Sequence, residues 1–348
     1  MKKLIIVALL LCFASYKVVA ADMNFVAPTV PETGKEFLSG RPETFRDGLR
    51  MILENALPYV HPAFTEAAEV CKKTIGIMMI LAIIGNFTAI NGSIIRLIGT
   101  VSLSVSFLSA TKALIPMGED AIHSLSAYGK LLLPVMTGAL AAQGHTVTSG
   151  ALYLGTAFFD AVLSAAIERV LLPAIYAFLA LSIASHALDE KSVGKIKDTI
   201  KSTMILALKI ILYAFTGYMT ISGAVSGSTD ALAMKAAKLA ISGMVPVVGG
   251  VLSDASEAVL VSSAILKNAA GIYGILAILA IAVGPFVRLG VQYMLVKLTA
   301  CLVASFGHKD LCGLIHDFSA ALGLVLAMTA AVSLMLLIST VCFMKVVV

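Results

Sequence analysis

The 348-residue chain is 59% apolar and only 13% charged, with a formal net charge of +5 and a mean hydropathy of +0.98. Globular proteins contain about 45–50% apolar and about 25% charged residues, so this composition argues against a soluble globular fold. The chain has enough apolar sequence for several spans of about 20 residues each, which predicts an all-α, polytopic membrane protein.

The first twenty residues have the order of a secretory signal peptide. Lys2 and Lys3 precede an apolar run from Leu4 to Phe13, and small residues suited to cleavage follow. Cleavage after Ala20 would place the mature N-terminus outside the cytoplasm. An uncleaved N-terminal anchor is the alternative.

Residues 21–70 differ from the rest of the chain because they are acidic and, in their first half, rich in proline. Apolar residues return every three or four positions from Thr44 to Leu57, as on an amphipathic helix. We expect a short extracytoplasmic region here, followed by a multi-span membrane domain over residues 71–348. This region either contacts a partner or is a solvated spacer.

Apolar runs dominate the sequence after residue 73 and are best interpreted as helices. Proline and glycine interrupt several of them, so broken or re-entrant helices are expected. The candidate spans are Thr74–Phe87, Ile94–Ile115, Ile122–Gln143, Val147–Ile167, Val170–Ala187, Met204–Val225, Ala231–Leu252, Ala255–Ala282, Pro285–Phe306 and Phe318–Met344.

The polar loop Asp189–Lys201 carries four lysines and is expected to be cytoplasmic by the positive-inside rule. Five candidate spans precede it, and this odd number agrees with an extracytoplasmic N-terminus.

Two pairs of prolines suggest an internal repeat. Pro134 and Pro173 are 39 residues apart, as are Pro246 and Pro285, which relates the two pairs by an offset of 112 residues. Transporter folds are often built from repeats with broken helices in matching places. A duplication is one interpretation, and a chance match between apolar sequences is the other.

The sequence lacks the motifs G-x-x-x-x-G-K-[ST], G-x-S-x-G, H-E-x-x-H and G-x-G-x-x-G. His308, Cys312 and His316 follow one another at steps of four residues, but the outer pair would lie about 12 Å apart along a helix. That separation is too large for one zinc ion. We therefore expect no catalytic residues, no metal site, no cofactor and no nucleic-acid partner.

Ionisable residues inside apolar spans are candidates for function, because a charge in hydrocarbon is costly and usually faces a cavity or a partner. Asp160 has apolar residues on both sides and is expected to lie in the interior. Lys209, Lys267 and Arg288 are further candidates. Snorkelling towards the membrane surface, or pairing between helices, is the alternative for the lysines.

The segment from Ser222 to Gly274 combines small residues and a Pro-Val-Val-Gly-Gly run with apolar sequence on both sides. Its aspartates stand at expected helix starts, where they would cap free N–H groups. Its G-x-x-x-G pair suits close helix contact, and its proline and paired glycines would loosen a helix. The segment thus either lines a pore or allows tight packing. The residues concerned are Gly223, Gly227, Asp230, Pro246, Gly249, Gly250 and Asp254.

The run SGSTDALAMKAAKLAISGMVPVVGGVLSDASEA, followed by AILKNAAGIYG, resembles the stage III sporulation protein AE family. The resemblance implies a membrane subunit of a channel or secretion-like complex that connects the mother cell with the engulfed forespore and sustains forespore development. It also implies a location in the mother-cell membrane facing the forespore. The implied partners are the other stage III sporulation membrane subunits and their ATPase, with a homo-oligomer as a further possibility.

A stand-alone secondary transporter is the alternative function. The interrupted helices, the proline offset and Asp160 favour it. Strict dependence on partner subunits would argue against it.

Overall fold

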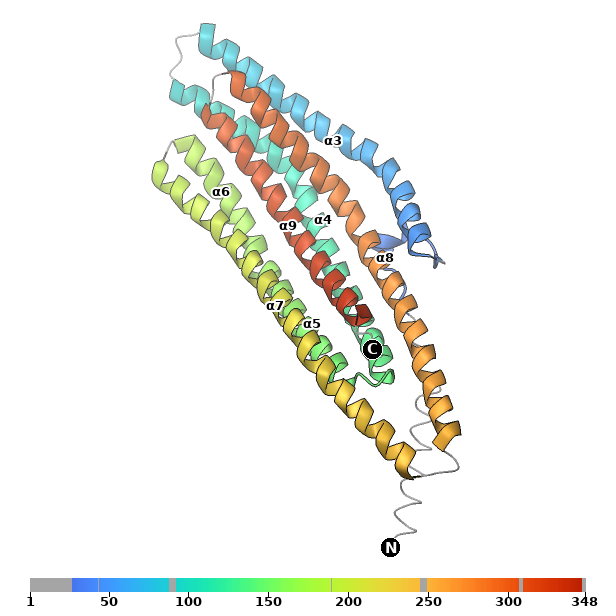
Figure 1. Cartoon of the computed structure of the whole chain (residues 1–348). Helices are drawn as coiled ribbons and strands as arrows, with labels where there is room; N and C mark the ends of the chain where they lie inside the picture. Colours follow the sequence, from blue (N-terminus) through green and yellow to red (C-terminus); the bar gives the residue numbers. More distant parts are fainter. Residues whose placement is uncertain are drawn as a thin grey trace.

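The computed structural model describes residues 27–42, 44–87, 92–188, 190–244, 249–306 and 309–345, without the side chains of residues 86–87, 191, 223–267, 306 and 309–310. Every regular element in these ranges is a helix, which confirms the all-α prediction. Figure 1 shows long helices that run side by side, with turns at both ends of the bundle.

Seven long helices form the bundle, and three short elements join or precede them. The long helices are α3 (Phe45–Phe87), α4 (Gly92–Ala142), α5 (Thr146–Ala166), α6 (Leu172–Leu188), α7 (Lys191–Met244), α8 (Gly249–Val303) and α9 (Lys309–Lys345). The short elements are α2 (Glu32–Lys35), a π-helical turn (Ile167–Leu171) and a 3₁₀ turn (Ala304–Phe306).

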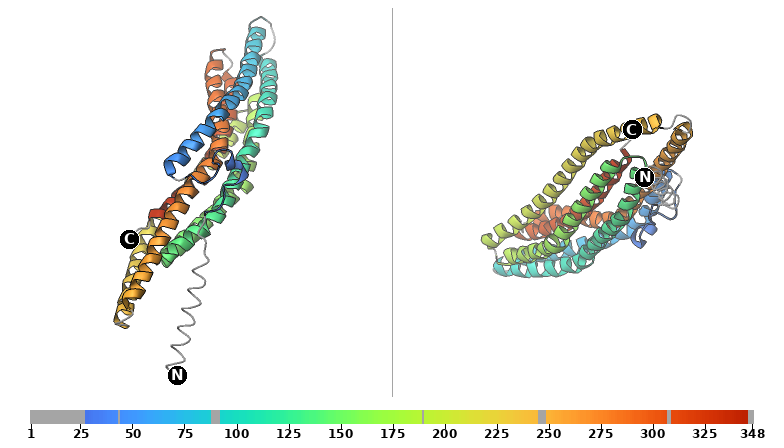
Figure 2. Two further views of the ribbon diagram at one scale, coloured as in Figure 1. Left: turned by 90° about the vertical axis from the view of Figure 1, so that its right-hand side faces the viewer. Right: turned by 90° about the horizontal axis from the view of Figure 1, so that it is seen from below.

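Helix α9 forms the centre of the bundle. It packs against α4 and α8 on one side and against α5, α6 and α7 on the other, while α3 covers α8 and α4 from outside (Figures 1 and 2). Phe318, Val325, Met328 and Met335 of α9 are completely buried. The hydrophobic core therefore follows α9 along its length.

Five helical stretches are long and apolar enough to cross a membrane, which confirms the prediction of a multi-pass protein. They are Gly92–Ala142, Thr146–Leu188, Ser192–Ser222, Asn268–Val303 and Leu311–Lys345. The 51 residues of α4 correspond to about 77 Å of helix, against about 30 Å for the hydrocarbon core of a bilayer. The bundle is thus longer than a membrane is thick.

The expected span boundaries at several prolines were wrong. Ile94–Ile115 and Ile122–Gln143 belong to one helix, α4, in which Pro116 and Pro134 are both internal. Pro285 likewise lies inside α8. A proline removes one backbone hydrogen bond, and packing against several neighbouring helices can keep such a helix continuous.

The expected boundary near Pro173 coincides with a local change of helix type. Between α5 and α6 the chain forms the π-helical turn, in which the Leu172 N–H donates to the Ile167 carbonyl. Pro173 follows one residue later, within the first turn of α6. A π turn inside an α-helix absorbs an extra residue without a loop, so Thr146–Leu188 remains one helical stretch.

The helix ends do not follow the 112-residue offset. This offset would place the turn between α4 and α5 at residues 255–257, which lie inside α8. It would also place the ends at Met244 and Gly249 near residues 132 and 137, which lie inside α4. The proline spacing is therefore better explained as a chance match.

Residues 27–42 form an N-terminal strap that packs on α8 and α3. Phe37 is buried and packs against Tyr59 with ring centroids 4.9 Å apart and ring planes tilted by 51°. A Cβ on Gly34 would lie 3.1 Å from the Ile281 backbone nitrogen. Thr44 then caps α3, since its Oγ1 accepts from the Asp47 N–H at 3.1 Å. Helix α3 continues without a break past residue 70, so the strap and the bundle share one core.

Arg41 holds the strap in place, and its replacement by methionine is expected to loosen it. Arg41 Nη2 donates to the Ala27 carbonyl at 2.9 Å, and its guanidinium lies 5.4 Å from the centroid of the Tyr273 ring. Loss of one such hydrogen bond costs about 1 kcal/mol. Tryptic cleavage after Lys35 in the native protein should therefore be about fivefold faster in Arg41→Met. Exposed Arg46 is the control, and an equal acceleration in Arg46→Met would contradict the assignment.

Candidate functional site

A buried ion cluster joins α6, α7 and α9 near one end of the bundle. Three donors share one carboxylate oxygen, Asp317 Oδ2: Ser182 Oγ at 2.6 Å, Lys197 Nζ at 2.6 Å and His186 Nε2 at 3.1 Å. Asp317 is 5% exposed and Lys197 is 8% exposed. A charged pair is therefore held inside the protein, with two further polar groups around it.

The tight connection between α6 and α7 brings the donors to the same point. Ser182 and His186 are four residues apart on α6 and so share one helix face. Lys197 comes from the first two turns of α7, directly after the connection. Gly313 of α9 leaves room for the imidazole ring, because a Cβ there would lie 2.7 Å from His186 Cε1.

The charges of this cluster are balanced, which suits a structural role. Lys197 and Asp317 neutralise each other, and the hydrogen bonds from Ser182 and His186 satisfy the carboxylate further. Such a pair is costly to break, because a single buried charge would remain. The cluster therefore locks three helices together at this end of the bundle.

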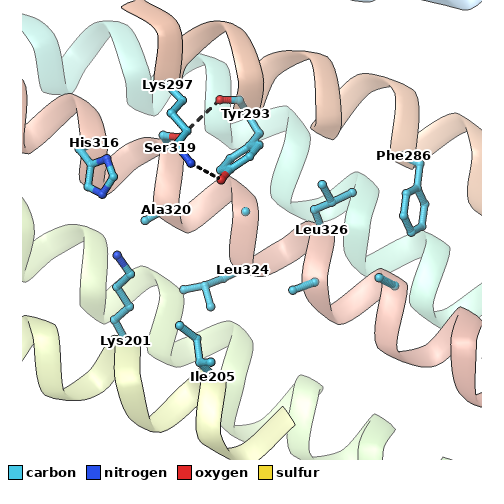
Figure 3. A pocket seen from close by; sticks show the side chains of 13 residues that line it. Lys201, Ile205, Phe286, Tyr293, Lys297, His316, Ser319, Ala320, Leu324 and Leu326 are labelled. Carbon is cyan, nitrogen blue, oxygen red and sulfur yellow. Dashed lines mark hydrogen bonds between the residues drawn. The ribbon is translucent and has the colours of Figure 1, made fainter. Parts of the chain in front are cut away.

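A pocket of about 610 Å³ opens next to the ion cluster, between α7, α8 and α9. Figure 3 shows Lys201 on α7, His316 on α9 and Lys297 on α8 towards one end of this pocket, with Phe286 and Leu326 towards the other. The lining residues of the described chain include no Asp or Glu. The pocket thus has a basic end and an apolar end.

Close packing between α8 and α9 forms one wall of the pocket. Lys297 Nζ donates to the Tyr293 hydroxyl at 3.1 Å, and Ser319 Oγ donates to the Tyr293 carbonyl at 3.4 Å. A Cβ on Gly323 would lie 2.9 Å from Tyr293 Cε2, so only glycine allows the ring to lie so close to α9. These contacts fix Lys297 at the mouth of the pocket.

Asp160 lies in a second buried polar site, between α4 and α5. It is 3% exposed, and its Oδ2 accepts from Ser126 Oγ at 2.8 Å. Ser164 Oγ donates to Ser126 Oγ at 3.4 Å. The other carboxylate oxygen of Asp160, Oδ1, has no hydrogen-bond partner within the described ranges. The structure thus places Asp160 in the interior and apart from the Asp317 cluster.

The expected pore or packing segment extends over the end of α7 and the start of α8. Gly223 and Gly227 lie in α7, Gly249 and Gly250 begin α8, and Pro246 lies outside the described residues. The expected span Ala231–Leu252 is wrong as a single helix, because α7 ends at Met244 and α8 begins at Gly249.

Two expected helix starts were also wrong. Asp230 lies well inside α7, and Asp254 lies in the second turn of α8. Neither occupies an N-cap position, since the small residues before them continue the helix. Lys267 is also in α8, with its side chain outside the described residues, and Arg288 is half-buried on α8.

Cys312 and His316 are on α9, and His308 lies outside the described residues. Cys312 is half-buried and His316 faces the pocket. Within the described ranges no three His, Cys, Asp or Glu side chains come close enough together to hold a metal ion.

Sequence reasoning missed the main residues of the ion cluster. The last expected span began at Phe318, one residue after Asp317, which left the acid outside the apolar run. Its partners are 120 to 135 residues away in the chain, so no local motif connects them. The signal that could have found it is the continuation of the apolar pattern on both sides of Asp317, as at Asp160.

Comparison with known proteins identifies the same family that the Ser222–Gly274 segment resembles. The profile of the stage III sporulation protein AE family matches residues 41–346, which include all of α3 to α9. The stage III sporulation protein AE of Bacillus subtilis (strain 168) is 25% identical over 237 residues. The matched part covers 68% of this chain and 59% of that relative's length. No solved structure matches the chain. The chain therefore belongs to the stage III sporulation protein AE family.

Proposed function

We propose that this protein is a membrane subunit of a channel or secretion-like complex between mother cell and forespore, needed for forespore development after engulfment. The observation that carries this proposal is the family match over nearly the whole helical bundle. A multi-pass bundle with interior polar sites suits a subunit that forms part of a passage through a membrane.

The proposed partners are other stage III sporulation membrane subunits and an ATPase. The sequence contains no phosphate-binding G-x-x-x-x-G-K-[ST] motif, so energy from nucleotide hydrolysis would come from a separate subunit. We expect no catalytic role for this chain. Its role would be structural, either forming or supporting the passage through the membrane.

The proposed location is the mother-cell membrane facing the forespore, with the mature N-terminus outside the cytoplasm. Basic residues gather at the end of the bundle where α3 meets α4 and α6 meets α7, which favours a cytoplasmic position for that end. They include Arg96, Lys195, Lys197, Lys201 and Lys297. Helix α3 begins part-way along the bundle beside α8 and runs towards this end (Figure 1), so we propose that the residues before it lie away from the cytoplasmic end.

The topology argument depends on helix α3. Two of the five stretches that are long and apolar enough to cross a membrane, Gly92–Ala142 and Thr146–Leu188, precede the loop around residue 190, and α3 is not among the five. The proposed extracytoplasmic N-terminus therefore requires α3 to make a third pass along the bundle, in place of the five passes expected from the sequence.

A clean deletion of the gene in its spore-forming host tests the proposal. We expect engulfment to be completed and forespore development to stop afterwards, with spore yield restored by the wild-type gene at another locus. Fluorescence microscopy of the membranes locates the arrest, and counts of heat-resistant spores measure it. A normal yield of spores from the deletion strain would refute the proposal.

The buried carboxyl of Asp160 favours a stand-alone proton-coupled transporter as a second candidate. Its Oδ1 has no partner in the described part of the chain, as a proton-carrying group in a transporter would require in one of its states. Purified protein alone in vesicles should then carry flux driven by a pH gradient, and Asp160→Asn should abolish it. Absence of any flux in the purified wild type would remove this candidate.

A further inference from the structure

We propose that the pocket between α7, α8 and α9 binds an anionic phospholipid, with the headgroup phosphate at its basic end and an acyl chain along its apolar end. This site goes beyond the proposed role in sporulation and does not depend on it. Four observations support it: the charge of the mouth, the arrangement of charge and apolar surface, the shape of the floor, and the length of the groove.

The mouth of the pocket carries positive charge that is not neutralised locally. Among the side chains that the structure describes, Lys201 has no carboxylate partner, and the polar contacts of Lys297 are with the Tyr293 hydroxyl and ring. Asp317, which follows His316 on α9, is already paired with Lys197. Two lysines and a histidine that converge between helices fit a lipid phosphate, which carries negative charge and accepts hydrogen bonds.

Charged and apolar surface are separated along the pocket. The basic groups lie at one end in Figure 3, and Ile205, Phe286 and Leu326 line the remainder. A soluble anion would use only the first part of such a pocket. A lipid has the same separation of a charged head from apolar chains, so it would use both parts.

The floor of the groove is formed by small residues of α9. Ala320, Gly323, Ala327 and Ala330 recur every three or four positions and all line the pocket. Helices α7 and α8 both pack on α9 but hardly contact each other in the described part of the chain. The pocket therefore opens over these small residues, between α7 and α8.

The length of the groove matches one leaflet of a bilayer. His316 and Ala330 are separated by about 21 Å along α9 at 1.5 Å per residue. Half of a hydrocarbon core of about 30 Å is about 15 Å, and the headgroup layer adds several ångströms. The volume of about 610 Å³ is also within the usual range for ligand pockets.

Native mass spectrometry of the full-length purified protein tests this site. The protein is titrated with phosphatidylglycerol or with phosphatidylcholine of the same acyl chains, and the bound fraction is measured. We expect phosphatidylglycerol to bind at least tenfold more tightly. Each of Lys201→Gln and Lys297→Gln should weaken its binding about fivefold, because one lysine near an anionic lipid contributes about 1 kcal/mol.

Lys195→Gln is the matched control, since it removes the same charge from an exposed position of α7 that does not line the pocket. It should bind phosphatidylglycerol like the wild type. Size-exclusion profiles confirm that all variants are folded. Equal binding of the two lipids, equal loss in all three variants, or full displacement of the lipid by millimolar inorganic phosphate would each overturn the proposal.

Discussion

Replacing Asp317 by alanine is expected to lower the free energy of unfolding by about 3–5 kcal/mol, because Lys197 would remain buried without its counter-charge. In a protein of this size the loss corresponds to a decrease in Tm of about 4–7 °C. Thermal unfolding of the purified protein in mild detergent, followed by circular dichroism, measures it. Helices α6 and α7 should separate from α9 at this end first.

Asp198 provides the control for this prediction. Its Oδ1 lies 3.6 Å from the same lysine nitrogen, but its side chain is 71% exposed. Exposed ion pairs contribute little, so Asp198→Ala should change the free energy of unfolding by less than about 1 kcal/mol. The double variant Lys197→Met with Asp317→Leu removes both charges and should recover most of the stability. Equal effects of Asp198→Ala and Asp317→Ala would contradict the assigned role of the buried pair.

Replacing Gly155 by alanine is expected to destabilise the protein by about 2–4 kcal/mol. A Cβ at this position would lie only 1.9 Å from Cε1 of Tyr218 on α7. The ring cannot easily move away, because the Tyr218 hydroxyl donates to the Ala151 carbonyl at 2.9 Å and Phe159 packs against it. Overpacking and the loss of this hydrogen bond together account for the expected magnitude.

Gly150 is the matched control on the same helix. A Cβ there would meet nothing within 4 Å, so Gly150→Ala changes only the helix propensity. It should stabilise α5 by about 0.5–1 kcal/mol. Denaturation midpoints of the two variants, measured side by side, should move in opposite directions. A decrease of similar size in both would show that the contact between α5 and α7 is not as tight as described.

The class of fold could be predicted from composition, but the helix lengths could not. Apolar content alone required membrane helices. The expected boundaries around Pro116 and at Pro285 failed because these helices continue through proline while packed against several neighbours. The local sequence shows that a proline removes a backbone hydrogen bond. The packing that keeps the helix continuous comes from helices that are far away in the chain.

The candidate site could likewise be predicted from the sequence only in part. Asp160 could be recognised because exposing a single acid of an apolar helix to lipid is costly, so the acid is expected to face the interior of the protein. Its side chain is 3% exposed. The Asp317 cluster could not, since His186 and Lys197 reach it only through the turn between α6 and α7 and the packing of both on α9. The Asp189–Lys201 segment was expected to be a cytoplasmic loop, yet its Lys197 points inward to pair with Asp317.

The most direct test of the proposed function is purification of the tagged protein from sporulating cells in mild detergent, with identification of everything that accompanies it. We predict recovery together with other stage III sporulation membrane subunits and an ATPase, in amounts that survive a wash with salt. Recovery of the protein alone, as a single monodisperse species, would contradict the subunit role and favour the stand-alone transporter.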